Sequence, residues 1–169
     1  ACNPTRDRWL NRKWHTLTGH YNVYFNGELK FKDAVLGYEK TIQNDFSKIL
    51  PVFLIPDEAA SKGLTSSMDE VIKKTSKSIQ MHTIGSYTDD SYFLMAKAQF
   101  YKGDYFAALE SFQYVNSKYP DSDLKKECTA WIALCYDGLN NKEKTVEYFI
   151  RLDSNIQKTN ITFPELREV

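Results

Sequence analysis

The stretch that decides the fold, residues 88–122, reads TDDSYFLMAKAQFYKGDYFAALESFQYVNSKYPDS. Its first part opens with acidic and hydroxyl residues, which favour the start of a helix, and continues with apolar residues to Tyr101. Gly103 supplies a turn, and the second part has apolar residues at helical spacing until Pro120, which cannot continue a helix. The stretch therefore predicts two helices that form an antiparallel hairpin with one apolar face.

The residues of this hairpin resemble a tetratricopeptide repeat. Tyr92 stands where an aromatic side chain opens the first helix, and Ala96 and Ala108 stand where small residues let the two helices approach. Phe112 and Pro120 occupy the aromatic and proline positions of the second helix. Since one hairpin cannot bury its own apolar face, the resemblance implies neighbouring hairpins.

Weaker copies of the same pattern predict these neighbours on both sides. One copy follows at about 123–155, where Ala133 and Phe149 match the small and aromatic positions. Another copy precedes the hairpin, as two helices joined by a turn. Its elements are expected at 9–25, at Asn26-Gly27-Glu28-Leu29 and at 31–49, which gives a hairpin of about 9–49.

The pattern is interrupted between the first two hairpins. Pro51 and Pro56 prevent a helix, so an irregular apolar segment is expected over 50–65. A capping box from Ser67 to Glu70 then predicts a single helix over 67–82. The sequence thus predicts an all-α fold of tetratricopeptide-like antiparallel hairpins, stacked as a short right-handed solenoid. We expect one domain over 9–169, with hairpins at about 9–49, 89–120 and 123–155, and a linker over 1–8.

Composition and motifs exclude several classes of function. The chain has 169 residues with 22 basic and 22 acidic side chains, which argues against a broad electrostatic footprint for nucleic acid or acidic lipid. No apolar run approaches the roughly 18 residues of a membrane-spanning helix. The sequence shows no nucleophile elbow, phosphate-binding glycine loop or metal-ligand spacing, and Cys128 and Cys135 suit a helical core. We expect a protein that is not an enzyme and that binds no metal, nucleic acid or small-molecule substrate.

The two ends of the chain carry their own signals. Cys2 follows Ala1 and precedes a polar run, which resembles the processing site of a bacterial lipoprotein, where the cysteine carries the acyl chains. The chain stops on the apolar residue Val169, so we expect it to be one segment of a longer protein.

Three separated phrases resemble the N-terminal part of the SprE/PorW family, tetratricopeptide lipoproteins of Bacteroidota. They are YNVYFNG at 21–27, ILPVF at 49–53 and DDSYFLMAKA at 89–98. The resemblance implies a covalent lipid on Cys2 as the only attached group, and a location at the periplasmic face of the outer membrane. It also implies a non-catalytic adaptor in gliding motility and type IX secretion. The implied partners are the outer-membrane translocon and the periplasmic ring and motor proteins. The chain departs from the family in keeping Ala1 before the cysteine.

One group of candidate partner contacts lies on the best repeat. In a tetratricopeptide array, the outward positions of the first helix of each hairpin line a concave groove. By register these positions are Asp90, Phe93, Lys97 and Tyr101. The alternative is that Phe93 and Tyr101 pack on the neighbouring repeat.

A second group of candidates is aromatic. The chain has 11 Tyr, 10 Phe and 3 Trp, many of which serve as wedges between helices, and a cluster of the remainder precedes Asn26. A first repeat has no upstream neighbour to cover it, so an aromatic start is either self-capped or meets a partner. The partner-binding candidates here are Trp9, Trp14, Tyr21 and Tyr24.

Two other functions fit a helical lipoprotein. One is the capture of a ligand such as a glycan at the outer membrane, where exposed aromatic rings would stack on sugars. The other is the assembly of outer-membrane barrels.

Overall fold

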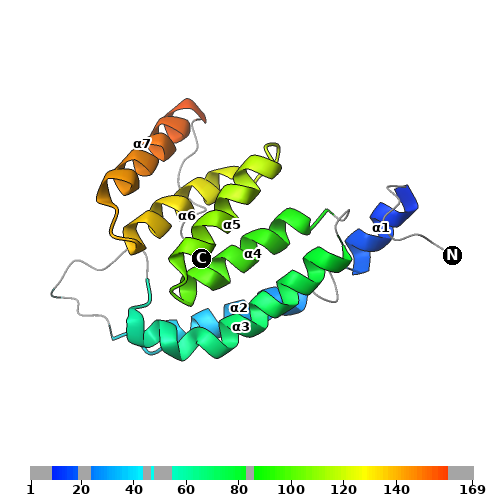
Figure 1. Cartoon of the computed structure of the whole chain (residues 1–169), viewed down its shortest axis with the longest axis horizontal. Coiled ribbons are helices and arrows are strands. Elements are labelled where there is room, and N and C mark those ends of the chain that lie inside the picture. Colours follow the sequence, from blue (N-terminus) through cyan, green and yellow to red (C-terminus); the bar gives the residue numbers. More distant parts are fainter. Residues whose placement is uncertain (1–8, 19–23, 44–46, 48–54, 83–85, 160–169) are drawn as a thin grey trace.

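The computed structural model describes residues 9–18, 24–43, 47, 55–82 and 86–159. These residues contain seven α-helices and no strand. The helices are α1 (Trp9–Thr18), α2 (Phe25–Glu39), α3 (Glu58–Met81), α4 (Thr88–Tyr101), α5 (Tyr105–Lys118), α6 (Lys125–Gly138) and α7 (Lys142–Thr159) (Figure 1). The predicted all-α fold class is confirmed.

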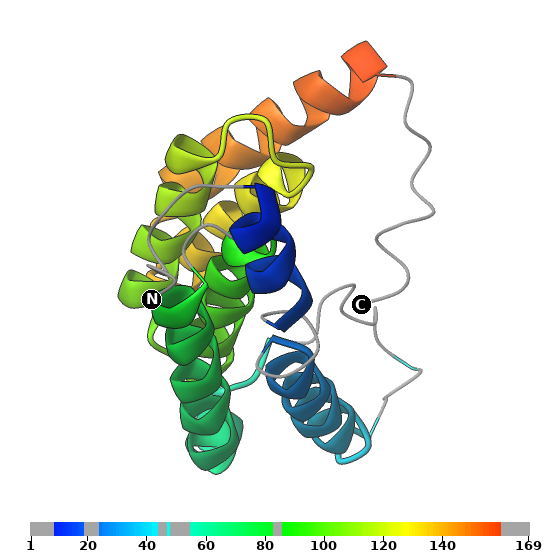
Figure 2. The ribbon, with the colours of Figure 1, turned by 90° about the vertical axis from the view of Figure 1, so that its right-hand side faces the viewer.

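Six of the helices form three antiparallel hairpins that stack in chain order (Figures 1 and 2). The pairs are α2 with α3, α4 with α5, and α6 with α7, and each helix packs on the next one along the chain. The turn between α4 and α5 and the turn between α6 and α7 each contain a residue with positive φ. These residues are Gly103 (φ 88°) and Asn140 (φ 57°). Glycine and asparagine tolerate this conformation better than other residues do. The predicted solenoid-like stack of hairpins is therefore what the chain forms.

Aromatic rings fill the core between the hairpins. The ring of Phe112 lies nearly parallel to that of Trp131, with centroids 5.7 Å apart. Phe100 meets the same indole edge-on at 5.2 Å, and Phe93 meets Phe112 at 5.5 Å. Such pairs contribute about 0.5–1.5 kcal/mol each beyond the area that they bury. Much of the aromatic content of the chain thus stabilises the contacts between neighbouring helices.

The first hairpin differs from its prediction. The expected turn at Asn26–Leu29 is wrong, because these residues belong to α2, which pairs with α3. Gly27 is buried, and a Cβ atom there would lie 3.6 Å from both Lys74 Cβ and Thr75 Cγ2. The glycine therefore lies at a close contact between helices instead of forming a turn.

The helix predicted over 31–49 ends ten residues early, at Glu39. The backbone N–H groups of Thr41 and Ile42 donate to the carbonyls three residues back, and the Thr41 hydroxyl donates to Tyr38 O at 2.6 Å. Hydroxyl side chains that bond the nearby backbone compete with a helix in this way. The irregular apolar segment is predicted to start at residue 50. Its first part, including Pro51, falls in residues 48–54, which lie outside the described residues.

The third helix begins earlier than predicted. The prediction of an irregular segment up to residue 65 and of a helix start at Ser67 is wrong, because α3 begins at Glu58. It follows Asp57, whose side chain accepts a hydrogen bond from the Ala60 N–H at 2.7 Å. The buried positions of α3 follow one face at helical spacing. These positions are Ser61, Leu64, Met68, Val71, Thr75 and Ser78. Because three of them are small and polar, the helical period of apolar residues is hidden in the sequence.

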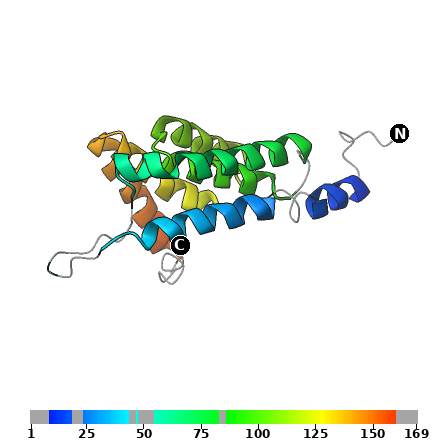
Figure 3. The ribbon, with the colours of Figure 1, turned by 90° about the horizontal axis from the view of Figure 1, so that it is seen from below.

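The N-terminal helix belongs to none of the three hairpins. The predicted helix over 9–25 appears as α1, Trp9–Thr18, followed by residues 19–23, which lie outside the described part of the chain. α1 lies at one end of the long axis of the molecule, beyond the start of α2 (Figure 3). It is therefore an addition to the end of the stack and not the first helix of a hairpin.

Candidate interaction surfaces

The Lys97 ammonium lies among three aromatic rings. Its Nζ atom is 5.1 Å from the ring centroid of Phe31, 5.7 Å from that of Phe93 and 5.5 Å from that of Trp131. These rings come from α2, α4 and α6, the first helix of each hairpin. The side chain is half-buried, and this burial lowers the pKa of the ammonium, while the charges of Glu127 and Glu28 oppose the shift. A cation held over ring faces gains electrostatic attraction that partly replaces its lost hydration.

Carboxylates lie near this lysine, because the charges of Glu28 and Glu127 act on Lys97 and both also act on Asp90. Glu28 of α2, Asp90 of α4 and Glu127 of α6 remain at least partly exposed. Burial, followed by the neighbouring charge of Asp89, raises the pKa of Asp90 from 3.8 to about 6. We call the surface formed by Glu28, Asp90, Lys97 and Glu127 the Lys97 face. It presents charges above an aromatic base, and three hairpins contribute to it.

The two aromatic candidates on α4 are buried. Phe93 is 7% exposed and packs edge-on against Phe112, while Tyr101 is 5% exposed and packs edge-on against Phe31 at 5.4 Å. Phe93 therefore packs within its own hairpin and Tyr101 packs on the neighbouring one, so neither lines a groove for a partner. Of the four positions selected by register, Asp90 and Lys97 are the ones that reach the surface.

Tyr24 lies at the junction between the N-terminal part of the chain and the stack. It is half-buried, and its ring centroid is 5.7 Å from that of Tyr87. Burial, assisted by the charge of Asp90, raises the pKa of its phenol well above the ordinary value. Tyr21 and Cys2, the other two predicted site residues of this region, lie outside the described residues.

The outer surface of α1 is apolar and exposed. Trp9 is 68% exposed, Trp14 is 65% exposed, and Leu10 and Leu17 are also exposed. Lys13 lies on the same side of the helix, with its Nζ 5.3 Å from the Trp9 ring centroid. We call these five residues the α1 face. Among the aromatic candidates that the structure describes before Asn26, Trp9 and Trp14 are exposed and Tyr24 is half-buried.

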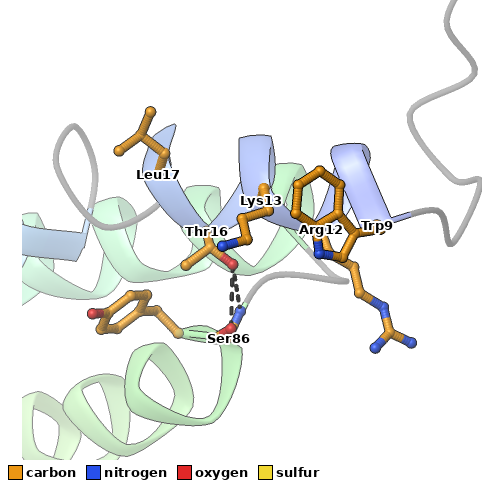
Figure 4. A pocket seen from close by; sticks show the side chains of 7 residues that line it. Trp9, Arg12, Lys13, Thr16, Leu17 and Ser86 are labelled. Carbon is orange, nitrogen blue, oxygen red and sulfur yellow. Dashed lines mark hydrogen bonds between the residues drawn. The ribbon is translucent and has the colours of Figure 1, made fainter.

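An open pocket of about 430 Å³ separates α1 from the start of α4 (Figure 4). Its lining is Trp9, Arg12, Lys13, Thr16, Leu17, Ser86 and Tyr87. Thr16 points across it to Ser86, whose backbone N–H donates to the Thr16 hydroxyl at 3.2 Å, while Leu17 points away from Ser86. The pocket is thus walled by polar and apolar groups from two segments distant in the sequence.

A histidine pair also holds α1 against the stack. Nδ1 of the buried His15 lies 3.1 Å from Nδ1 of His82, at the end of α3, which fits a hydrogen bond with one ring as donor. Burial and the neighbouring His15 lower the pKa of His82. The two histidines are 67 positions apart, so no local spacing in the sequence links them. The hydrogen bonds of His15 with His82 and of Thr16 with Ser86 thus form a polar contact between α1 and the stack.

The two cysteines of the described residues lie in the core. Cys128 and Cys135 are buried in α6, and burial raises the pKa of both thiols to about 12, so that they stay protonated and unreactive. No cluster of three or more His, Cys, Asp or Glu side chains that suits a metal ion occurs within the described ranges. No helix in those ranges is long and apolar enough to cross a membrane.

Comparison with protein families supports the reading of α4 and α5. Residues 90–122 match the family described as tetratricopeptide repeat. This segment is a tetratricopeptide repeat. No curated protein sequence matches the chain. The tetratricopeptide repeat covers the middle hairpin, and the flanking hairpins α2–α3 and α6–α7 pack against it in chain order.

Proposed function

We propose that the protein is a non-catalytic adaptor that binds other proteins through its stacked hairpins. The observation that carries the proposal is the tetratricopeptide repeat at 90–122 in the middle of the stack, because arrays of such hairpins typically act as scaffolds for protein–protein contact. The partly exposed charges of the Lys97 face give this scaffold a surface that extends over three hairpins.

The Lys97 face is the part of the stack that we assign to a protein partner. Its ammonium is already partly desolvated, so less hydration is lost when a partner covers it. The aromatic rings beneath are fixed by packing, which reduces the ordering cost of binding. Charges around a preorganised centre favour selection of a partner with the opposite pattern.

We further propose that this adaptor belongs to the type IX secretion and gliding machinery. The support is the resemblance of the phrases at 21–27, 49–53 and 89–98 to SprE/PorW proteins. In this proposal the protein links the outer-membrane translocon to the periplasmic ring and motor proteins. Its location is the periplasmic face of the outer membrane, where a lipid on Cys2 anchors it.

Recovery of partners from native membranes tests the adaptor. The full chain is used as bait on detergent-solubilised membranes of a gliding bacterium, and a translocon or ring component is the expected catch. Lys97→Met should lower its recovery about tenfold, because the central charge is lost. Lys118→Met, on the exposed end of α5, serves as the matched control. Recovery of neither component by the unaltered chain would contradict the type IX assignment, and equal recovery by Lys97→Met would contradict the Lys97 face.

The lipid requires a separate test in cells. Metabolic labelling with palmitate should mark the chain, and Cys2→Ala should abolish the label. Unchanged labelling of the variant would exclude Cys2 as the attachment site.

A further inference from the structure

The α1 face combines features that suit the boundary between water and lipid. Two tryptophans and two leucines share one side of a short helix and are more than half exposed: Trp9, Leu10, Trp14 and Leu17. Tryptophan prefers the headgroup level of a bilayer because its ring is apolar and its N–H remains able to donate. Helices with such a side, flanked by basic residues, lie in the plane of a membrane surface.

The arrangement of α1 leaves this side free to meet a plane. His15 and Thr16, which contact His82 and Ser86, point toward the stack. Trp9, Lys13 and Leu17 border the open pocket beside this contact, while Leu10 and Trp14 are exposed outside it. The helix also lies at the end of the long axis of the molecule, where the hairpins do not extend past it (Figures 1 and 3). A flat surface can therefore contact α1 without meeting α2–α7.

The charge of the chain is distributed to match an acidic surface. The total is zero, but residues 1–24 hold four basic side chains and one acidic one. The basic residues are Arg6, Arg8, Arg12 and Lys13. Zero net charge therefore excludes a broad footprint over the whole protein but not a local one at this end.

The position of Lys13 favours lipid over a protein partner. It lies between the apolar side chains of the α1 face, with its ammonium near the Trp9 ring. The core of a protein interface is depleted of lysine, because the charge would have to be buried there. At a bilayer the stem lies along apolar surface while the ammonium reaches the headgroups.

We infer that the α1 face docks on the surface of a bilayer that contains anionic lipids. This contact is independent of the lipid proposed for Cys2 and of the protein partner proposed for the Lys97 face. It orients the stack with α1 against the membrane and the hairpins leading away from it (Figure 3).

Vesicle binding by the full chain without acylation tests the inference. Vesicles of equal parts phosphatidylglycerol and phosphatidylcholine should bind the chain, and vesicles of phosphatidylcholine alone should bind it more weakly. Binding should blue-shift the tryptophan emission, and the shift comes from Trp9 and Trp14 because Trp131 is already buried. Each of Trp9→Ala and Trp14→Ala should weaken partition about tenfold, and Lys13→Glu should remove the preference for anionic vesicles.

Phe106→Ala is the matched control. Phe106 of α5 is 69% exposed, like the α1 tryptophans, but lies outside the α1 face, so its removal should leave partition unchanged. Circular dichroism verifies that each variant keeps its helices. An equal loss with Phe106→Ala, no binding of the unaltered chain, or unchanged partition of the Trp9→Ala, Trp14→Ala double variant would overturn the inference. Capture of a membrane protein through Trp14, without binding to pure lipid, would assign the α1 face to a protein instead.

Discussion

Replacing Asp90 by Asn should stabilise the protein at neutral pH and have little effect in acid. The pKa of this carboxyl is raised from 3.8 to about 6, first by burial and then by Asp89. The folded state thus holds the proton more tightly than the unfolded chain does. Asp90 therefore contributes stability below about pH 4, and this contribution is lost as the pH rises through about 6.

The magnitude follows from the shift. A difference of about two pKa units corresponds to about 3 kcal/mol of destabilisation at pH 7.5. The side chain is only half-buried, so screening by solvent reduces this value to about 1.5 kcal/mol. Its place in the first turn of α4 favours a negative charge and offsets about 0.5 kcal/mol of the gain from the substitution. Asp90→Asn should thus raise the free energy of unfolding at pH 7.5 by about 1 kcal/mol, or Tm by about 2–4 °C.

Urea unfolding followed by circular dichroism, at pH 7.5 and at pH 3.5, measures this effect. The variant should be more stable than the unaltered chain at the higher pH, and the two should nearly coincide at the lower one. Asp121→Asn, at an exposed position after α5, reports the general effect of removing a surface carboxylate. A variant that is less stable at pH 7.5, or a difference that does not change with pH, would refute the reasoning.

Three further substitutions test the packing of the helices. Gly138→Ala should cost about 1–3 kcal/mol in urea unfolding, because a Cβ atom there would lie 2.8 Å from Tyr105 ring atoms; a neutral result would mean that the ring moves freely. Gly63→Ala should instead gain up to about 1 kcal/mol, because nothing lies within 4 Å of a Cβ atom at this exposed helical position; destabilisation would argue against a helix at 58–66. Trp131→Ala should cost about 3–5 kcal/mol and broaden thermal unfolding, since the indole joins α4, α5 and α6; a loss below 1 kcal/mol would contradict its central role.

The middle hairpin could be predicted because its determinants are local. Ala96, Ala108 and Phe112 lie within a few helical turns of one another, and Gly103 marks the turn directly. Each of these residues has the same role in the structure that its type predicts: the alanines and Phe112 are fully buried, and Gly103 has a positive φ.

The first hairpin was mispredicted because its determinants lie in the tertiary structure. Gly27 suggests a turn when only its neighbours in sequence are considered, but the closeness of α3 and α4 explains it. Ser61, Thr75 and Ser78 occupy buried positions of α3 without adding to its apolar pattern. The Thr75 hydroxyl donates within the helix, to Val71 O at 2.9 Å, and the Ser78 hydroxyl accepts from Ser91 of α4 at 3.1 Å. The Ser61 hydroxyl is buried with no hydrogen-bond partner among the described residues.

The candidate surfaces were also predictable only where the local sequence determines them. Register on α4 selected Asp90 and Lys97, but could not tell that Phe93 and Tyr101 are covered by rings from other helices. The pairing of His15 with His82 depends on where α1 docks, which no periodicity in the chain encodes.

The central position of Lys97 makes it a natural probe of cooperativity. Its ammonium touches one ring from each hairpin, so the departure of any hairpin from the stack removes part of its cover. Repeat arrays unfold by losing units from their ends, and here both end units, α2–α3 and α6–α7, contribute to the environment of the same amine. The rate at which an amine-specific reagent labels Lys97 in the folded protein would therefore measure the opening of whichever end unit is less stable. Comparing that rate in Phe31→Leu and Trp131→Leu variants would identify which end opens first.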